Sequence, residues 1–122
     1  MAFKHYLEIS KVQWYCIEYV RHVYELKEAQ NKLNWFNLPQ NIARFGEHER
    51  AYAFREYIRR GHIVEHYQYT LVVNYNFSQE RLEKLAELSQ ICEFKDTYDD
   101  THIHLELSNY DWYAGLRKVT KE

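Results

Sequence analysis

The chain has 122 residues, of which 46% are hydrophobic and 28% are charged, and its formal net charge is −2. This composition excludes a disordered chain, and the length is that of one domain spanning residues 1–122. The two cysteines, Cys16 and Cys92, stand far apart and outside any CxxC spacing, which argues against a zinc ribbon and a secreted disulfide scaffold. No apolar run predicts a signal peptide or a membrane span, so we expect a cytoplasmic protein without membrane contact.

The first predicted element is a long helix from about Tyr6 to Leu33, because apolar residues recur along it at steps of three and four. Ile17, Val20 and Tyr24 widen the apolar stripe to roughly 200°, where a helix that covers one core needs about 100°. Trp14 lies outside even that arc. We therefore expect the helix to contact a second chain as well as its own domain, through Trp14, Ile17, Val20 and Tyr24.

A connection over residues 34–46 leads to a second predicted helix over Glu47–Arg60, for which Gly61 is the expected C-cap. The residues expected to face the core from this helix are Ala51, Phe54 and Ile58.

The residue pattern of the C-terminal half predicts strands. Apolar and polar residues alternate over Tyr69–Phe77, which is the period of a strand, and Ser78 is a suitable N-cap for a third helix. Later predicted elements are a strand over Cys92–Thr97, a turn over Tyr98–Thr101, a strand over His102–Leu107 and a short last helix opened by Asn109 and Asp111. The predicted fold is therefore α+β: a helical N-terminal half packed on a β-α-β-β-α unit with a small mixed or antiparallel sheet.

One strand of this unit carries a pattern of metal-ligand residue types. His102, His104 and Glu106 share one strand face, and two imidazoles with a carboxylate can ligate a divalent metal. The motif resembles the His-hydrophobic-His strand of the HUH nucleases. That resemblance implies a metal-dependent phosphodiester enzyme with Tyr110 or Tyr113 as the attacking tyrosine.

The alternative interpretation of this strand is an ordinary solvated face. A two-residue loop at Asp99-Asp100 would place Thr97 opposite His102 and Lys95 opposite His104, where the lysine would repel a metal ion.

A second set of candidate residues is basic and aromatic. Arginines interleaved with an aromatic ring can hold phosphates while the ring stacks on a base. The predicted nucleic-acid-binding residues are Arg44, His48, Tyr52, Arg55, Arg59 and His62. The alternative is a solvated helix face paired with neighbouring glutamates.

No glycine-rich phosphate loop and no Ser-His-Asp set can be assembled from this sequence, so we expect binding rather than catalysis, without a cofactor. Twelve tyrosines favour contact surfaces, because each places a large ring and a hydroxyl at one point. We expect a homodimeric module that docks on a macromolecular partner, of the accessory or inhibitor type encoded by phages and plasmids. Nucleic-acid binding and the HUH-like enzyme remain as alternatives.

Overall fold

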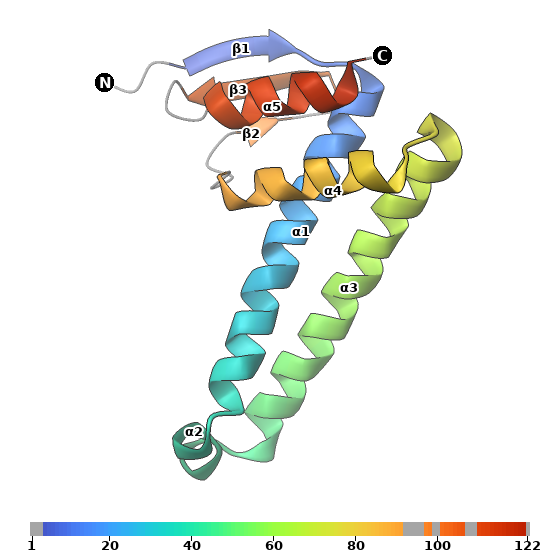
Figure 1. Ribbon diagram of the computed structural model, residues 1–122. Coiled ribbons are helices and arrows are strands. Elements are labelled where there is room, and N and C mark those ends of the chain that lie inside the picture. Colours follow the sequence, from blue (N-terminus) through green and yellow to red (C-terminus); the bar gives the residue numbers. More distant parts are fainter. Residues whose placement is uncertain (1–3, 92–96, 99–100, 107–109, 122) are drawn as a thin grey trace.

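In the computed structural model the chain forms a head and a long arm (Figure 1). The structure describes residues 4–91, 97–98, 101–106 and 110–121. The arm consists of α1 (Lys11–Phe36) and α3 (Glu47–Tyr75), which run antiparallel, with α2 (Pro39–Arg44) at its tip. The head contains β1 (Lys4–Glu8), α4 (Gln79–Glu87), the 3-10 helix η1 (Leu88–Gln90), β2 (Thr97–Tyr98), β3 (His102–Glu106) and α5 (Tyr110–Thr120), grouped around the first half of α1.

A capping box fixes the start of α1. The Ser10 hydroxyl accepts a hydrogen bond from the Gln13 backbone N–H at 3.3 Å, and the Gln13 side chain accepts one from the Ser10 N–H at 2.9 Å. The residues before Ser10 form β1 instead of the first turn of the helix, so the expected start at Tyr6 is wrong. The helix then continues to Phe36, beyond the expected end.

α3 is one continuous helix through Gly61 and through most of the segment predicted as a strand. It ends where Asn76 adopts a left-handed φ of 58° and the Phe77 N–H donates to the Leu71 carbonyl at 3.1 Å. An interior glycine costs a helix about 1 kcal/mol. Continuing the helix offsets that cost because it buries Val64 and Leu71 against the rest of the core.

The sheet is small and antiparallel, in the order β1-β3-β2. His104 lies opposite Tyr6 on one side and opposite Thr97 on the other, and Tyr98 lies opposite Ile103. The predicted pairing of Thr97 with His102 is therefore wrong, because the connection between the strands is longer than a two-residue loop. Residues 92–96 of the predicted strand, Asp99-Asp100 of the predicted turn and residues 107–109 lie outside the described residues.

The prediction of an α+β fold is wrong: the described chain is mostly helical, without a β-α-β-β-α unit. The first strand expected in that unit belongs to α3. The head sheet instead takes one of its strands from the N-terminus, which the apolar pattern had assigned to a helix.

The core lies in the head and in the adjoining half of the arm. Ile17, Val20 and Leu71 are fully buried there, together with Trp112 and Leu116 of α5. α1 has its wide apolar arc because α3 covers one side of it while α4, η1 and α5 cover another.

The number of buried residues falls toward the tip of the arm. Among residues 24–63, all of which the structure describes, only Asn41 and Ala53 are buried. The outer half of the arm is therefore a two-helix hairpin with little core of its own. None of the described helices combines the length and the apolarity that crossing a membrane requires.

Candidate protein-interaction surface

The side of α3 that faces away from α1 is apolar and exposed. Phe54 is 53% exposed, Tyr69 67% and Val73 57%, and Ile58 and Val72 are also exposed. At 100° per residue these positions fall within about 100° of the helix circumference. Because α3 packs chiefly on α1, this side is open (Figure 1). We call it the outer face, defined by Phe54, Ile58, His62, Glu65, Tyr69, Val72 and Val73.

The outer face includes residues that the sequence placed in the core. Phe54 and Ile58 were expected to be buried together with Ala51, but all three are exposed, and Ala53 is buried in their place. The expectation failed because α3 is apolar on two sides, and α1 can cover only one of them.

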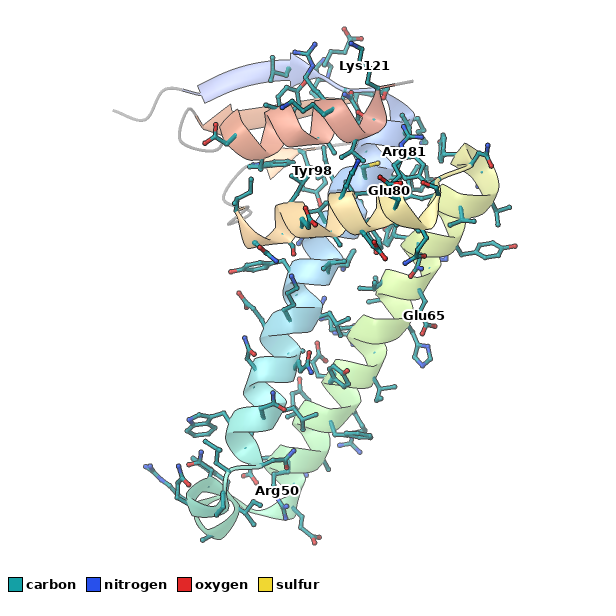
Figure 2. All side chains as sticks on the ribbon, in the orientation of Figure 1. Arg50, Glu65, Glu80, Arg81, Tyr98 and Lys121 are labelled. Atoms are coloured by element: carbon teal, nitrogen blue, oxygen red, sulfur yellow. The ribbon has the colours of Figure 1, made fainter. Side chains whose placement is uncertain are left out.

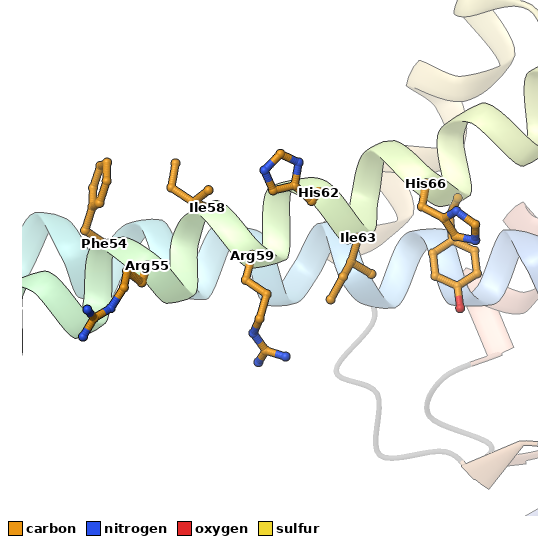
Figure 3. A pocket seen from close by; sticks show the side chains of 8 residues that line it. Phe54, Arg55, Ile58, Arg59, His62, Ile63 and His66 are labelled. Atoms are coloured by element: carbon orange, nitrogen blue, oxygen red, sulfur yellow. The ribbon is translucent and has the colours of Figure 1, made fainter.

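A groove runs along one flank of the outer face (Figure 3). Phe54, Ile58 and His62 form one row along α3, and Arg55 and Arg59 point to the other side. The groove is open to solvent and has a volume of about 710 Å³. Rows of side chains four residues apart are the ridges between which a second helix packs.

The middle of the outer face is charged. The His62 Nδ1 atom lies 3.7 Å from a Glu65 carboxylate oxygen, and both side chains are more than two-thirds exposed. Glu65 projects from α3 away from α1 (Figure 2). An exposed pair of this kind contributes little to stability within one chain. The outer face therefore has two apolar ends and a charged centre that is open to further contacts.

The structure brings together most of the predicted nucleic-acid-binding residues. On α3, His48, Tyr52, Arg55, Arg59 and His62 occupy a flank of about 80° beside the apolar stripe. Arg44 lies apart on α2, with its guanidinium 5.4 Å from the Phe45 ring centroid.

Glutamates already contact part of this flank. Arg59 donates to both carboxylate oxygens of Glu56, at 2.8 and 3.3 Å. The hydrogen bond from Arg59 is the main reason that the pKa of Glu56 is lowered. No ion pair reaches Arg55 among the described residues. The flank therefore offers one arginine without a carboxylate partner and one that is engaged.

Two of the four residues in the interface predicted on α1 are buried inside this chain. Ile17 and Val20 are 0% exposed and belong to the core of this chain, so they cannot meet another chain. Trp14 is half-buried with its ring edge-on to Tyr15 at 5.0 Å, and Tyr24 is half-buried. The wide apolar arc is satisfied inside the molecule, by α3 and the head helices.

The predicted metal-ligand strand is β3, and its backbone alternation keeps His102, His104 and Glu106 on one face. The Nδ1 atom of half-buried His102 lies 2.8 Å from the Thr101 hydroxyl. The side chains of His104, Glu106 and Tyr110 lie outside those described. The described residues hold no cluster of three metal-ligand side chains.

The second tyrosine suggested as a nucleophile is packed in the core. Tyr113 is 8% exposed and belongs to the buried cluster of the head.

A row of polar groups joins α1 to the head. The Tyr98 hydroxyl donates to Glu18 at 2.9 Å and accepts from Arg21 at 3.2 Å, and His22 lies 3.2 Å from Glu18. Burial acts to raise the pKa of Glu18, but hydrogen bonds from His22 and Tyr98 outweigh it, so the pKa is lowered. Burial is the main reason that the pKa of Tyr98 is raised. Because the Tyr98 hydroxyl and the Glu18 carboxylate are engaged with each other and with Arg21 and His22, we assign the row a structural role.

The tip of the arm is the second exposed apolar region. The Trp35 and Phe45 ring centroids lie 5.3 Å apart, and the Asn41 side chain donates to the Trp35 carbonyl at 2.7 Å, which fastens α2 to the end of α1. Trp35 is 45% exposed, Leu38 42% and Ile42 41%. We call these three residues the tip patch.

The chain matches no protein-family model, no curated protein and no solved structure. Its function must therefore be inferred from its own surfaces.

Sequence reasoning did not connect three of the seven outer-face residues with the others. Tyr69, Val72 and Val73 were assigned to a strand, so their helical relation to Phe54 and Ile58 went unnoticed. Residues 47–75 carry the missing signal when they are placed on a single helical wheel, because apolar residues then gather on two sides.

Proposed function

We propose that this chain is a protein-interaction module that acts as a homodimer and docks on a macromolecular partner. The observation that supports this best is the apolar surface of the arm, exposed on the outer face and again at the tip patch. Contiguous exposed apolar surface on a globular domain marks an interaction site. We place the module among the accessory or inhibitor proteins of the kind that phages and plasmids encode, acting in the cytoplasm.

The form of the groove favours a macromolecular partner over a small substrate. Small-molecule sites are enclosed and combine apolar walls with a few convergent polar groups. The groove beside the outer face is open along its length and lined by successive turns of one helix. Side chains of another helix fit such a surface better than a small molecule does.

In this proposal the tip patch takes the macromolecular partner. Trp35 and the neighbouring Arg44 are of the residue types that dominate binding hot spots. The tip lies at the end of the arm farthest from the described elements of the head, where a bulky partner has room to approach (Figure 1).

The test is a pull-down from lysate of the source cell with tagged wild type, Ile42→Glu and Ile91→Glu, with and without nuclease. Ile91 is an exposed isoleucine in the head, so Ile91→Glu is the matched control. We expect a stoichiometric protein that survives nuclease, is retained by Ile91→Glu and is lost with Ile42→Glu. Equal recovery by all three proteins would contradict docking at the tip.

Nucleic-acid binding is the second candidate, supported by the gathering of His48, Tyr52, Arg55 and Arg59 on one flank of α3. It predicts an affinity for single-stranded nucleic acid that falls steeply with salt. It also predicts a loss of binding in the double variant Arg55→Ala, Arg59→Ala. Unchanged binding by that variant would exclude the flank.

A further inference from the structure

We infer that the outer face of α3 binds the outer face of a second copy of this chain, with the two α3 helices antiparallel. This inference rests on the proposed function and names the occupant of the outer face. It places a two-fold axis midway between His62 and Glu65.

The residues of the outer face are distributed symmetrically about that midpoint. Ile58 precedes it by as many residues as Tyr69 follows it, and the same holds for Phe54 and Val73. An antiparallel pair therefore sets Ile58 against Tyr69 of the second copy and Phe54 against Val73 of the second copy. Each contact joins an aromatic ring to an aliphatic side chain. A two-fold interface requires this kind of self-complementary surface.

The charged centre selects the antiparallel arrangement. In this register His62 of each copy faces Glu65 of the other, while its own Glu65 lies 3.7 Å away. A parallel pair would set the Glu65 carboxylates of the two copies against each other and separate each His62 from Glu65 of the other copy. Like charges across an interface are unfavourable, and complementary charges fix orientation and register.

The exposed apolar area of the outer face is of the order that a protein–protein interface requires. Phe and Tyr each bury roughly 150–250 Å² when fully covered, so the apolar residues of the outer face at their observed exposures offer roughly 500 Å². The central pair His62 and Glu65, with Arg55 and His66 on the flank, brings the face toward the ~800 Å² per partner of a standard interface.

The outer half of the arm also lacks what a stable hairpin needs. With only Ala53 and Asn41 buried among residues 24–63, α1 and α3 have little core there. Most helical stability in proteins comes from packing of an apolar face. Pairing two arms covers the second apolar side of each α3 helix and so buries the outer faces.

Gly61 is a further sign of a close neighbour. It lies inside α3 at the edge of the outer face, and a Cβ placed on it would meet nothing within 4 Å. Packing within the chain therefore does not require glycine at this position. A glycine allows the close approach of another backbone.

The rest of the fold is compatible with this pairing. α1 covers the inner side of α3, so the outer face is reached without moving any element (Figure 1). An antiparallel pair directs the tip patches of the two copies to opposite ends.

The test is sedimentation equilibrium of the purified wild type, Ile58→Glu and Ile91→Glu over a range of concentrations. We expect twice the mass of one chain for wild type and Ile91→Glu, and association weakened at least about tenfold for Ile58→Glu. Circular dichroism must show equal helix content in the three proteins, which separates loss of pairing from loss of folding. A monomeric wild type, or an Ile58→Glu variant that dimerises as wild type does, would overturn the inference.

A charge exchange tests the register. Glu65→Lys sets the introduced ammonium group of one copy against His62 of the other and is expected to weaken the dimer. The double variant His62→Glu, Glu65→Lys restores opposite charges and is expected to restore the dimer. Failure of the double variant to recover would overturn the antiparallel register.

Combining this test with the pull-down separates the two proposals. A monomer that still loses its protein partner with Ile42→Glu overturns the self-pairing and leaves the docking function. A dimer that captures no protein supports the pairing and overturns the docking.

Discussion

Arg60 on α3 lies 2.6 Å from a Glu25 carboxylate oxygen on α1, and the two side chains form an ion pair between the arm helices. Each side chain is about a quarter exposed, at 27% and 26%. Arg60 also contacts Glu56 one turn earlier in its own helix, at 3.1 Å. The pair lies beyond the end of the core, so it fixes the spacing of α1 and α3 where few apolar contacts do so.

Replacing Arg60 with methionine is expected to destabilise the fold by about 1–2 kcal/mol, because it leaves Glu25 without its partner on the other helix. Arg59→Met should leave stability nearly unchanged, because Arg59 is 60% exposed and its ion pair with Glu56 lies within one helix. Urea unfolding at one fixed protein concentration measures both. Equal effects of the two substitutions would show that the Arg60–Glu25 ion pair contributes nothing to stability.

Glu18 is expected to give the protein a pH-dependent stability. Its pKa is lowered in the folded state, so its contribution is fully present above the unfolded pKa and is lost as pH falls through the folded one. The difference in unfolding free energy between wild type and Glu18→Gln should therefore shrink as pH falls through the acidic range in which glutamates take up a proton. Tyr98→Phe, which removes a donor to Glu18, should reduce this dependence. A difference that is constant with pH would refute the assignment.

The helical glycines Gly61 and Gly115 should respond oppositely to alanine. At Gly115 a Cβ would lie 2.6 Å from Leu88 Cδ2 in the core, so Gly115→Ala is expected to destabilise by about 1 kcal/mol. At Gly61 the space is open, so Gly61→Ala should stabilise an unpaired arm by about 0.5–1 kcal/mol. Thermal unfolding in the Ile58→Glu background isolates the single chain. A stabilised Gly115→Ala would mean that Leu88 moves aside freely.

Charge substitutions should separate the core from the surface. Val20→Asp places a carboxylate at a fully buried position and is expected to abolish cooperative unfolding. Phe54→Asp, at a position that is 53% exposed, should retain the helix content and the unfolding transition of the single chain. Circular dichroism during heating distinguishes them. A Val20→Asp variant that folds cooperatively would show that Val20 is not in the core and that α1 can form an interface.

The sequence predicted the helices that have clear local signals. Periodicity indicated the long helix that contains Ile17 and Val20, and Ser78 was predicted as the N-cap of α4, where its side chain accepts from the Arg81 N–H at 3.2 Å. Such signals act within one or two turns and therefore do not depend on the rest of the fold.

Features that depend on distant contacts were not predictable. The run Tyr69–Phe77 alternates like a strand and is rich in residues that favour strands. Its residues up to Tyr75 are nevertheless helical, because Leu71 and Tyr75 then pack toward α1, with the Tyr75 and Tyr15 ring centroids 5.7 Å apart. The exposure of Phe54 and Ile58 was not predictable either. Periodicity shows that a face is apolar, but not whether the chain has another element to cover it.

Disulfide trapping tests the central claim most directly. Chains carrying Ile58→Cys are mixed with chains carrying Tyr69→Cys, all with Cys92→Ser, and are oxidised under non-denaturing conditions. Cys16 does not interfere, because it is fully buried and burial raises the pKa of its thiol to about 12.

The antiparallel pairing predicts a mixed dimer joined between positions 58 and 69. It predicts no dimer from Ile58→Cys alone, because its two copies would lie about 16 Å apart along the helices at 1.5 Å per residue. Monomers throughout, or a dimer that Ile58→Cys forms with itself as readily as with Tyr69→Cys, would contradict it.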